Sequence, residues 1–541
     1  MNLNKYFFIS FLFMLSGVTC FMGFILCMVL HKNIMLEFNL MNLNSIEFKF
    51  IMYVDWISMI FSSVVLFISS LVLIYSKIYM SCECNRFLWL TFFFVMFMLI
   101  MILSPSILGV VLGWDGLGLI SYCLVIYYQS KGSFNSGFIT AASNRLGDSL
   151  LILSIVFYSV EGNYLFWESY IDGFINFFLA CLTKSAQFPF SAWLPLAMAA
   201  PTPISSLVHS STLVTAGVYM LIRFNNYLHL SGASIYLFII SFFTITIAAF
   251  SSFFEFDLKR IIAFSTLGQL GFMMMLLSLG ESYISFFHLL VHALFKALLF
   301  MCAGCYIFSG NSIQDLRKMG SVNLNSLMKF SVFISSFSLM GVPFSSGFYS
   351  KDLLLELIYM NWGGTGLGLM MLVAAFLTIA YSVRVIKFMN MNNSWILWSE
   401  PNKELIIPIL IMSVMNSVFG SVMNWILIDS YFICVNIEFK MMIVTILLIS
   451  LVWQGDLLID NVVMFMIYNL LYTMSISKIL GKAGYLFYMV YCYLDQGWLE
   501  YFMNILKSGI KNFSFWVVNT MFSHHMYLYS IWLIMFMILI V

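Results

Sequence analysis

Residues 282–308 read SYISFFHLLVHALFKALLFMCAGCYIF, and this stretch already indicates the class of protein. It is long and apolar enough to form a helix that crosses a bilayer, which takes about 20 residues. Within it, His288, His292 and Lys296 are spaced four residues apart, so all three lie on one face of that helix. A charged group inside a membrane costs about 2.5–3.5 kcal/mol on insertion scales, so this row of ionisable side chains points to a function, such as a proton relay.

The composition of the whole chain agrees with a membrane protein. Of its 541 residues, 62% are hydrophobic and 9% are charged, whereas about 25% are charged in an average soluble domain. A soluble protein of this length would need far more polar surface to cover its core. The composition therefore excludes a soluble enzyme, a disordered protein and a nucleic-acid binder, and the formal net charge of +1 offers no surface for a strongly charged partner.

Hydrophobic runs divide the chain into about sixteen predicted transmembrane segments. Backbone polar groups must be satisfied within the lipid, so runs this long form helices rather than barrel strands. The predicted segments are 6–30, 55–79, 87–103, 106–128, 136–159, 172–190, 191–199 with 203–224, 233–254, 260–279, 282–308, 326–357, 366–389, 404–428, 441–454, 460–475 and 523–541.

Two of these segments are interrupted in a similar way. The first break covers 183–195 and contains Lys184, and the second covers 341–352 and contains Lys351. Both breaks contain proline, which removes a hydrogen bond inside a helix and breaks it. Paired broken helices in the two halves of a chain are typical of inverted-repeat transporters. Two unrelated packing kinks are the alternative interpretation.

Two more ionisable residues stand in apolar surroundings. Asp115 lies in a glycine-rich stretch at 112–118, and His209 follows the prolines of the first break. Burial disfavours the charged forms of lysines and carboxyl groups, so such groups can exchange protons when their pairing changes. A zinc site at the histidines of 282–308 is disfavoured, because the glutamate of an H-E-x-x-H motif is absent and a lysine stands beside them.

Three further charges accompany this set. Arg145 and Asp148 are three residues apart on a predicted helix, close enough for an internal ion pair. A structural role and a proton-handling role both remain open for this pair. Asp352 follows Lys351 directly and therefore points in another direction on a helix, toward an aqueous exit or a neighbouring group.

No redox-cofactor or nucleotide motif is visible in the chain. Cys302 and Cys305 have C-x-x-C spacing, but they lie in an apolar run with no second pair nearby, which predicts buried thiols. The energy for moving protons against a membrane potential, about 2.3 kcal/mol per charge per 100 mV, must then come from another subunit or from ion exchange.

At its polar motifs the chain resembles the antiporter-like, proton-translocating subunits of respiratory complex I. The resemblance runs through most of the chain. It rests on residues 113–118, 144–148, 183–195, 200–203 through 209–214, 257–266, 292–297 and 347–352, and on 495–498 near the C-terminus.

The resemblance implies an all-α polytopic fold with two inverted five-helix repeats at 106–224 and 233–389. N-terminal transmembrane helices would occupy 1–105, and a C-terminal extension would occupy 400–541. The chain would be a core subunit of the complex I membrane arm in the mitochondrial inner membrane, a part of NADH:ubiquinone reductase that translocates protons. NADH, FMN, iron–sulfur clusters and ubiquinone would bind to other subunits, and no cofactor, metal or redox site is expected in this chain. Its expected partners are the neighbouring antiporter-like subunit and membrane lipids, cardiolipin included.

The resemblance also implies roles for the buried ionisable residues. Asp115 takes the place of the family's usual glutamate as the partner of Lys184. Its side chain is one methylene shorter, so the pairing is expected to be looser or bridged by water. Lys296 would be the central relay lysine, and Lys351 would be the group nearest the exit. The residues expected to connect the lysines are His209, His288 and His292.

Two other functions compete with this interpretation. A free-standing cation/proton antiporter, or a subunit of one, is similar across the core, but the tail after about residue 400 favours complex I. A purely structural membrane anchor is disfavoured, because so many buried ionisable groups would be kept without a use.

The tail contains a stretch with a different pattern, at 476–520. Its lysines recur at i, i+4 among aromatic residues, and about 45 helical residues would reach nearly 70 Å. This pattern predicts an amphipathic helix that lies along the membrane arm, and the resemblance implies such a lateral helix that ends in an anchoring span, here at 523–541. A pair of weakly hydrophobic spans with a loop near Asp495 is the alternative.

Overall fold

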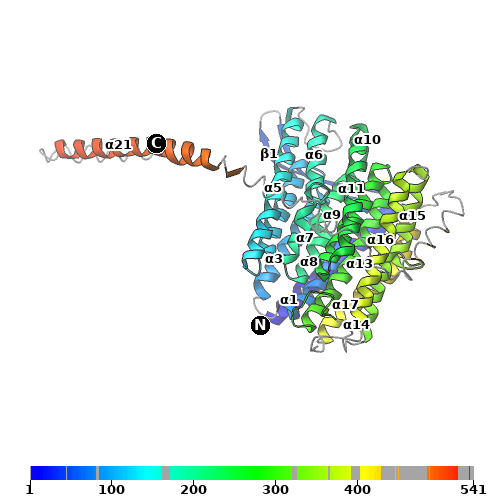
Figure 1. The fold of residues 1–541 in the computed structure, drawn as a ribbon. Helices are drawn as coiled ribbons and strands as arrows, with labels where there is room; N and C mark the ends of the chain where they lie inside the picture. Colours follow the sequence, from blue (N-terminus) through cyan, green and yellow to red (C-terminus); the bar gives the residue numbers. More distant parts are fainter. Residues whose placement is uncertain are drawn as a thin grey trace. The chain divides into compact units, whose positions relative to one another are not determined.

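The computed structural model describes residues 2–43, 46–80, 84–160, 171–319, 326–362, 366–390, 403–427 and 488–521, with a few single positions besides (Figure 1). The chain forms two compact units, Met1–Thr473 and Met474–Val541, and each is described by itself. The predicted spans 441–454, 460–475 and 523–541 lie outside the described residues, apart from isolated positions.

The first unit begins with two packed helices that are connected by a β-hairpin. Helix α1 (Asn2–Leu30) packs against α2 (Trp56–Tyr79), and the antiparallel strands β1 (Ile34–Leu43) and β2 (Ile46–Val54) lie between them in the sequence. The hairpin was not predicted, because its strands alternate apolar and polar residues only in part and are too polar to count as spans. Asp55 begins α2 with a capping box, since its carboxylate accepts a hydrogen bond from the Ser58 backbone N–H at 3.0 Å.

The rest of the described part of this unit is helical apart from turns and loops. Its longer helices are α3 (Cys84–Leu103), α4 (Ile107–Val125), α5 (Lys131–Val160), α6 (Ile171–Lys184), α9 (Leu213–Arg223), α11 (Ala233–Phe254), α12 (Leu258–Ser278), α13 (Ser282–Ser309), α14 (Ser326–Met340), α15 (Ser346–Trp362), α16 (Gly366–Asn390) and α17 (Lys403–Leu427). Within the described residues, ten helices are long and apolar enough to cross a membrane. A helical polytopic membrane fold is therefore confirmed.

The first predicted break is present, and it begins earlier than the predicted span 172–190 allows. Helix α6 ends at Lys184, because the prolines that follow cannot donate the hydrogen bonds of a continuous helix. Only short turns follow: η2 (Phe190–Ala192), α7 (Trp193–Leu196), η3 (Ala197–Ala199) and α8 (Thr202–Leu207). A π-helical turn, η4 (Val208–Thr212), then leads into α9.

The second predicted break divides the expected span 326–357 into two helices. Helix α14 ends at Met340 and α15 begins at Ser346. Gly341 between them has a φ of +81°, a conformation that side chains with a Cβ rarely adopt, so the chain turns here without steric cost.

Helix α13 lies at the centre of the unit and is buried along nearly its whole length. It packs against α2, α8, α12, α14, α15 and α17. Figure 1 shows α9 and α13 between α5 on one side and α16 on the other. Cys302 and Cys305 on α13 are buried free thiols, as predicted. The row of ionisable residues on α13 is therefore enclosed by protein on all sides.

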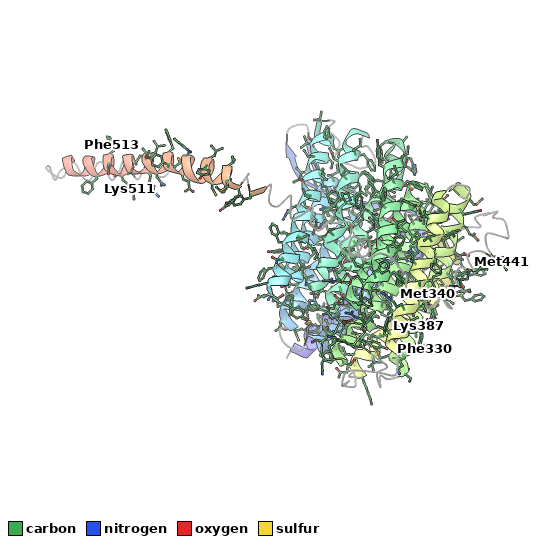
Figure 2. The ribbon with its side chains drawn as sticks, in the orientation of Figure 1. Phe330, Met340, Lys387, Met441, Lys511 and Phe513 are labelled. Atoms are coloured by element: carbon green, nitrogen blue, oxygen red, sulfur yellow. The ribbon has the colours of Figure 1, made fainter. Side chains whose placement is uncertain are left out.

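In the second unit, residues 488–521 are helical and include η5 (Cys492–Leu499) and α21 (Glu500–Met521). This range overlaps the predicted long helix at 476–520 and ends one residue after it. Lys511 and Phe513 project from α21 on opposite faces, as two residues separated by two positions do on a helix (Figure 2).

Candidate functional site

Lys184 lies at the end of α6 and is 1% exposed. Its Nζ donates a hydrogen bond to the backbone carbonyl of Trp114 at 3.3 Å and lies 5.1 Å from the centre of the Trp114 ring. A Cβ placed on Gly118 would be 3.3 Å from the same nitrogen. The ammonium group thus lies against one turn of α4, between residues 114 and 118.

Two carboxylates act on Lys184 from neighbouring helices. They are Asp148 on α5 and Asp115 on α4. No direct ion pair joins Asp115 to Lys184 among the residues that the structure describes. Asp148, predicted only as a supporting charge, is buried, whereas Asp115, predicted as the partner, is half-buried.

Asp148 also forms the ion pair that its spacing from Arg145 predicted. Arg145 Nη1 donates to Asp148 Oδ2 at 3.1 Å, and the side chain of Asp148 is 6% exposed against 57% for Arg145. The indole N–H of Trp114 lies close to the same carboxylate. The buried carboxylate therefore lies between Arg145 and the turn of α4 that holds Lys184.

His209 lies in the π-helical turn η4 and is buried. The centre of its ring is 6.3 Å from that of Trp193 in the first break. Neither of its ring nitrogens has a hydrogen-bond partner in the structure. The π turn therefore places an unsatisfied imidazole beside the break that carries Lys184.

Lys296 is enclosed by the helices around α13 and is fully buried. Its Nζ donates to the hydroxyl oxygen of Ser265 on α12. The Ser265 hydroxyl in turn donates to the backbone carbonyl of Ile262 at 2.7 Å, which leaves its lone pairs free to accept from the lysine. Ser265 is therefore a ready acceptor for this lysine.

The two histidines of α13 differ in their partners. His288 bonds on both sides, with Nδ1 2.8 Å from Ser350 Oγ on α15 and Nε2 3.0 Å from Gln269 Oε1 on α12. The ring of His292 is 6.4 Å from that of His288, and both of its nitrogens lack a partner. His288 thus connects three helices, whereas His292 offers two unused polar atoms.

Lys351 lies just after the second break and is 5% exposed. Its Nζ donates to Thr378 Oγ1 on α16 at 2.8 Å and to the carbonyls of Leu339 and Met340 at 3.4 and 3.2 Å. These carbonyls end α14, where the helix dipole is negative. Three acceptors match the three N–H groups of an ammonium ion. Asp352, the next residue, is half-buried.

One set of buried polar residues was missed by the sequence analysis. They hold the ionisable groups but are uncharged, so the cost of burying a charge did not reveal them. A signal was present on α12, where two polar residues stand four apart and therefore share one face. The missed residues are Ser265, Gln269, Ser350 and Thr378.

A second ion pair lies at the end of the unit where the β-hairpin meets α2. Arg223 at the end of α9 donates to Asp55 through both terminal nitrogens, Nη2 to Oδ1 at 2.7 Å, and through Nε to the Tyr219 hydroxyl at 2.9 Å. Burial by itself raises the pKa of Asp55, but the hydrogen bonds and charge of Arg223 hold that pKa below its ordinary value. The pair ties α2 to α9.

Comparisons with known proteins place these residues in a family context. A family model described as "NADH:quinone oxidoreductase/Mrp antiporter, TM" matches residues 104–378. A second, described as "NADH-Ubiquinone oxidoreductase (complex I), chain 5 N-terminus", matches residues 40–88. The first match contains every ionisable site residue from Asp115 to Asp352 and ends before α17.

Relatives in animals match over long stretches. NADH-ubiquinone oxidoreductase chain 5 of Anopheles gambiae is 38% identical over 98% of both chains. The proteins of the same name from Locusta migratoria and Mytilus edulis are 49% and 46% identical, over 64% and 65% of this chain and 63% and 64% of theirs.

Two solved structures share the fold. A chain of the Mrp complex from Dietzia sp. DQ12-45-1b superposes with a TM-score of 0.66 and 21% identity, covering 98% of this chain and 61% of that one. A chain of the membrane-bound sulfane sulfur reductase, an archaeal respiratory membrane complex, has a TM-score of 0.69 and 19% identity, covering 82% and 92%.

Proposed function

The chain belongs to the NADH-ubiquinone oxidoreductase chain 5 family, and on that premise we propose how its buried residues move protons. It is a proton-translocating subunit of the membrane arm of respiratory complex I and a multi-pass protein of the mitochondrial inner membrane. Similarity to a complex I subunit over 98% of both chains favours this function over that of a free-standing antiporter. Electron transfer from NADH to ubiquinone is proposed to take place in other subunits.

We propose that protons pass from the Lys184 site through the centre of the unit to Lys351. The observation that carries this proposal is the bridge made by His288. Its ring joins Gln269 on α12 to Ser350 on α15, and Ser350 directly precedes Lys351. The relay residues are Asp115, Lys184, His209, His292, His288, Lys296 and Lys351.

Water completes this path where the protein has no contact. His209 and His292 are both buried with unsatisfied ring nitrogens. Leaving buried polar atoms unpaired is costly, so water molecules are the natural partners for them. Protons would cross these two gaps along hydrogen-bonded water, and the wetting of the gaps would control the flow.

Charge repulsion gives the path its direction. Lys351 acts electrostatically on Lys296, and Lys296 has a single hydroxyl partner, whereas Lys351 has three acceptors. A proton that binds Lys296 gives this side chain a positive charge, and that charge repels the positive charge on Lys351. This repulsion would release the proton of Lys351 to the exit, with Asp352 beside it.

At the entry, Asp148 and Asp115 would set the charge on Lys184. Closing or opening the Arg145–Asp148 ion pair would change the field at Lys184, because Asp148 is one of the two carboxylates that act on this lysine. A signal from the electron-transferring subunits could act through this pair.

The finer architecture is proposed on the same basis. The repeats at 106–224 and 233–389 each contain one broken helix with a buried lysine, Lys184 or Lys351. Helix α21 is proposed as part of a lateral helix that contacts neighbouring antiporter-like subunits and lipids such as cardiolipin. No cofactor is proposed for this chain, and the described residues contain no group of three His, Cys, Asp or Glu that could hold a metal ion.

The test is the substitution Lys296→Met in the assembled complex, measured as NADH-driven proton pumping in sealed membrane vesicles. Methionine keeps much of the volume and removes the titratable group, so pumping should be lost while assembly survives. Lys387→Met is the matched control, because Lys387 is a lysine in the last turn of α16 that is not part of the proposed relay (Figure 2). Wild-type pumping by an assembled Lys296→Met complex would refute the proposal.

A further inference from the structure

The second break is held by a residue on α17, outside the region that the antiporter family model matches. Asn416 is 1% exposed. Its Oδ1 accepts a hydrogen bond from Ser346 Oγ at 3.1 Å, and its Nδ2 donates to Ser338 Oγ at 3.3 Å. Ser346 begins α15 and Ser338 lies near the end of α14. One amide group therefore bridges the two halves of the broken helix.

The direction of these bonds explains why an amide is suited to this position. The Ser338 hydroxyl donates its proton to the carbonyl of Ser335 at 2.8 Å, so toward Asn416 it can only accept. The Ser346 hydroxyl donates toward Asn416. Asparagine supplies the donor for one serine and the acceptor for the other, which neither a carboxylate nor an apolar side chain does.

Close backbone contacts support the same arrangement. A Cβ on Gly347 would clash with the carbonyl oxygen of Ser338, so α14 and α15 touch directly at the break. A Cβ on Gly420, one turn after Asn416, would lie 2.5 Å from the Cα of Ser346, so α17 also touches α15. The three helices can meet this closely only because glycine stands at both positions.

We infer that Asn416 is a positioning residue for Lys351. The carbonyls that accept from Lys351 belong to Leu339 and Met340, which directly follow Ser338, whereas Lys351 itself is carried by α15. The three acceptors converge on the lysine only while the two half-helices keep their mutual orientation. The amide bridge maintains that orientation, and this inference rests on the proposed relay role of Lys351.

The position of α17 gives the bridge a wider consequence. This helix also packs against α13, which carries Lys296, and against α2. A displacement of α17 would therefore reach both the relay helix and the break. Helix α17, which lies outside the antiporter-like core, would therefore control how Lys351 holds its proton.

The experiment compares variants of Asn416 in the assembled complex. Asn416→Leu matches asparagine in size but lacks its donor and acceptor pair, whereas Asn416→Gln keeps both groups on a longer side chain. We expect a several-fold loss of protons pumped per NADH oxidised in Asn416→Leu and a partial return in Asn416→Gln. If Asn416 acted through packing alone, Asn416→Leu would pump normally, and the longer side chain of Asn416→Gln would cause the loss.

Amide hydrogen exchange over residues 341–347 provides a second measurement. Exchange should be faster in Asn416→Leu than in wild type. Ser417→Ala is the matched control, because Ser417 is exposed on the same helix and its hydroxyl bonds to the Val414 carbonyl, at 2.8 Å. That variant should leave exchange and pumping unchanged. If Asn416→Leu fails to assemble, Ser338→Ala, which removes one of the two bonds, should give the same two effects more weakly.

The outcomes separate the inference from the proposed function. Normal pumping and exchange in assembled Asn416→Leu, together with defective pumping in Lys351→Met, would overturn the inference and leave the proposed function standing. Normal pumping in Lys351→Met would overturn both.

Discussion

The Lys351 side chain donates a hydrogen bond to Thr378 Oγ1 at 2.8 Å, which joins α15 to α16 beside the second break. The same threonine hydroxyl donates to the Ala375 carbonyl at 2.7 Å, so its orientation is set before the lysine binds. The bond to Thr378 is the shortest hydrogen bond that Lys351 makes, and Thr378 lies on α16, outside the broken helix.

Replacing Thr378 by valine should weaken proton pumping while preserving the fold. Valine has nearly the same shape but no acceptor, and a hydrogen bond to a charged group contributes about 1.5–3 kcal/mol. We expect several-fold slower pumping per NADH oxidised in Thr378→Val and near wild-type pumping in Thr378→Ser, measured in sealed vesicles. Equal pumping in both variants would show that Lys351 does not need this hydroxyl.

The link between α12 and α15 through His288 should depend on Gln269. Gln269→Leu removes the acceptor of His288 Nε2–H and leaves the ring held only by Ser350. Pumping should fall, and quinone reduction that is coupled to it should fall in parallel. Ser278→Ala serves as a control on the same helix, since its hydroxyl bonds only within α12. An undiminished rate in Gln269→Leu would exclude His288 from the path.

The two carboxylates near Lys184 should differ in importance. Asp148 is buried whereas Asp115 is half-buried, so water screens the charge of Asp148 less, and Asp148→Asn should reduce pumping more than Asp115→Asn. Asp115→Glu keeps the charge and should be tolerated. The measurement is the initial rate of NADH-driven acidification in vesicles with matched complex content. A larger defect in Asp115→Asn would restore Asp115 as the principal partner.

The Asp55–Arg223 pair should stabilise the hairpin end near neutral pH. The pKa of Asp55 is lowered in the folded protein, so its contribution is fully present above the ordinary aspartate value of about 3.9 and is lost as the pH falls through the lowered pKa. Asp55→Asn should therefore lower the melting temperature of the detergent-solubilised complex at pH 7, by an amount that stays constant between pH 6 and 8. A difference that varies within this range would point to another titrating group.

The C-terminal unit should hold the subunit in the complex rather than carry protons. Truncation after Leu470 removes α21 and leaves every relay residue in place. Native electrophoresis should then show a smaller or less stable complex. Full-size, fully stable complex I from the truncated chain would count against a bracing role.

Several parts of the structure followed from local properties of the chain. The long apolar runs required helices, because lipid offers no partners for the backbone. The prolines and glycines at 183–195 and 341–352 predicted both breaks, since their effect on a helix is local. The hairpin at residues 34–54 escaped prediction, because its polar and apolar residues alternate too weakly to stand out beside transmembrane runs.

The membrane class, the two breaks and the positions of the buried charges could be read from the amino-acid sequence, because each depends on residues adjacent in the chain or on one helix face. The partners of those charges could not. Lys184 bonds to the Trp114 carbonyl, Thr378 holds Lys351, and Asn416 bridges the second break only because helices distant in sequence pack side by side. A hydrogen bond requires a distance of about 3 Å, and only the packing of the helices sets such a distance between them.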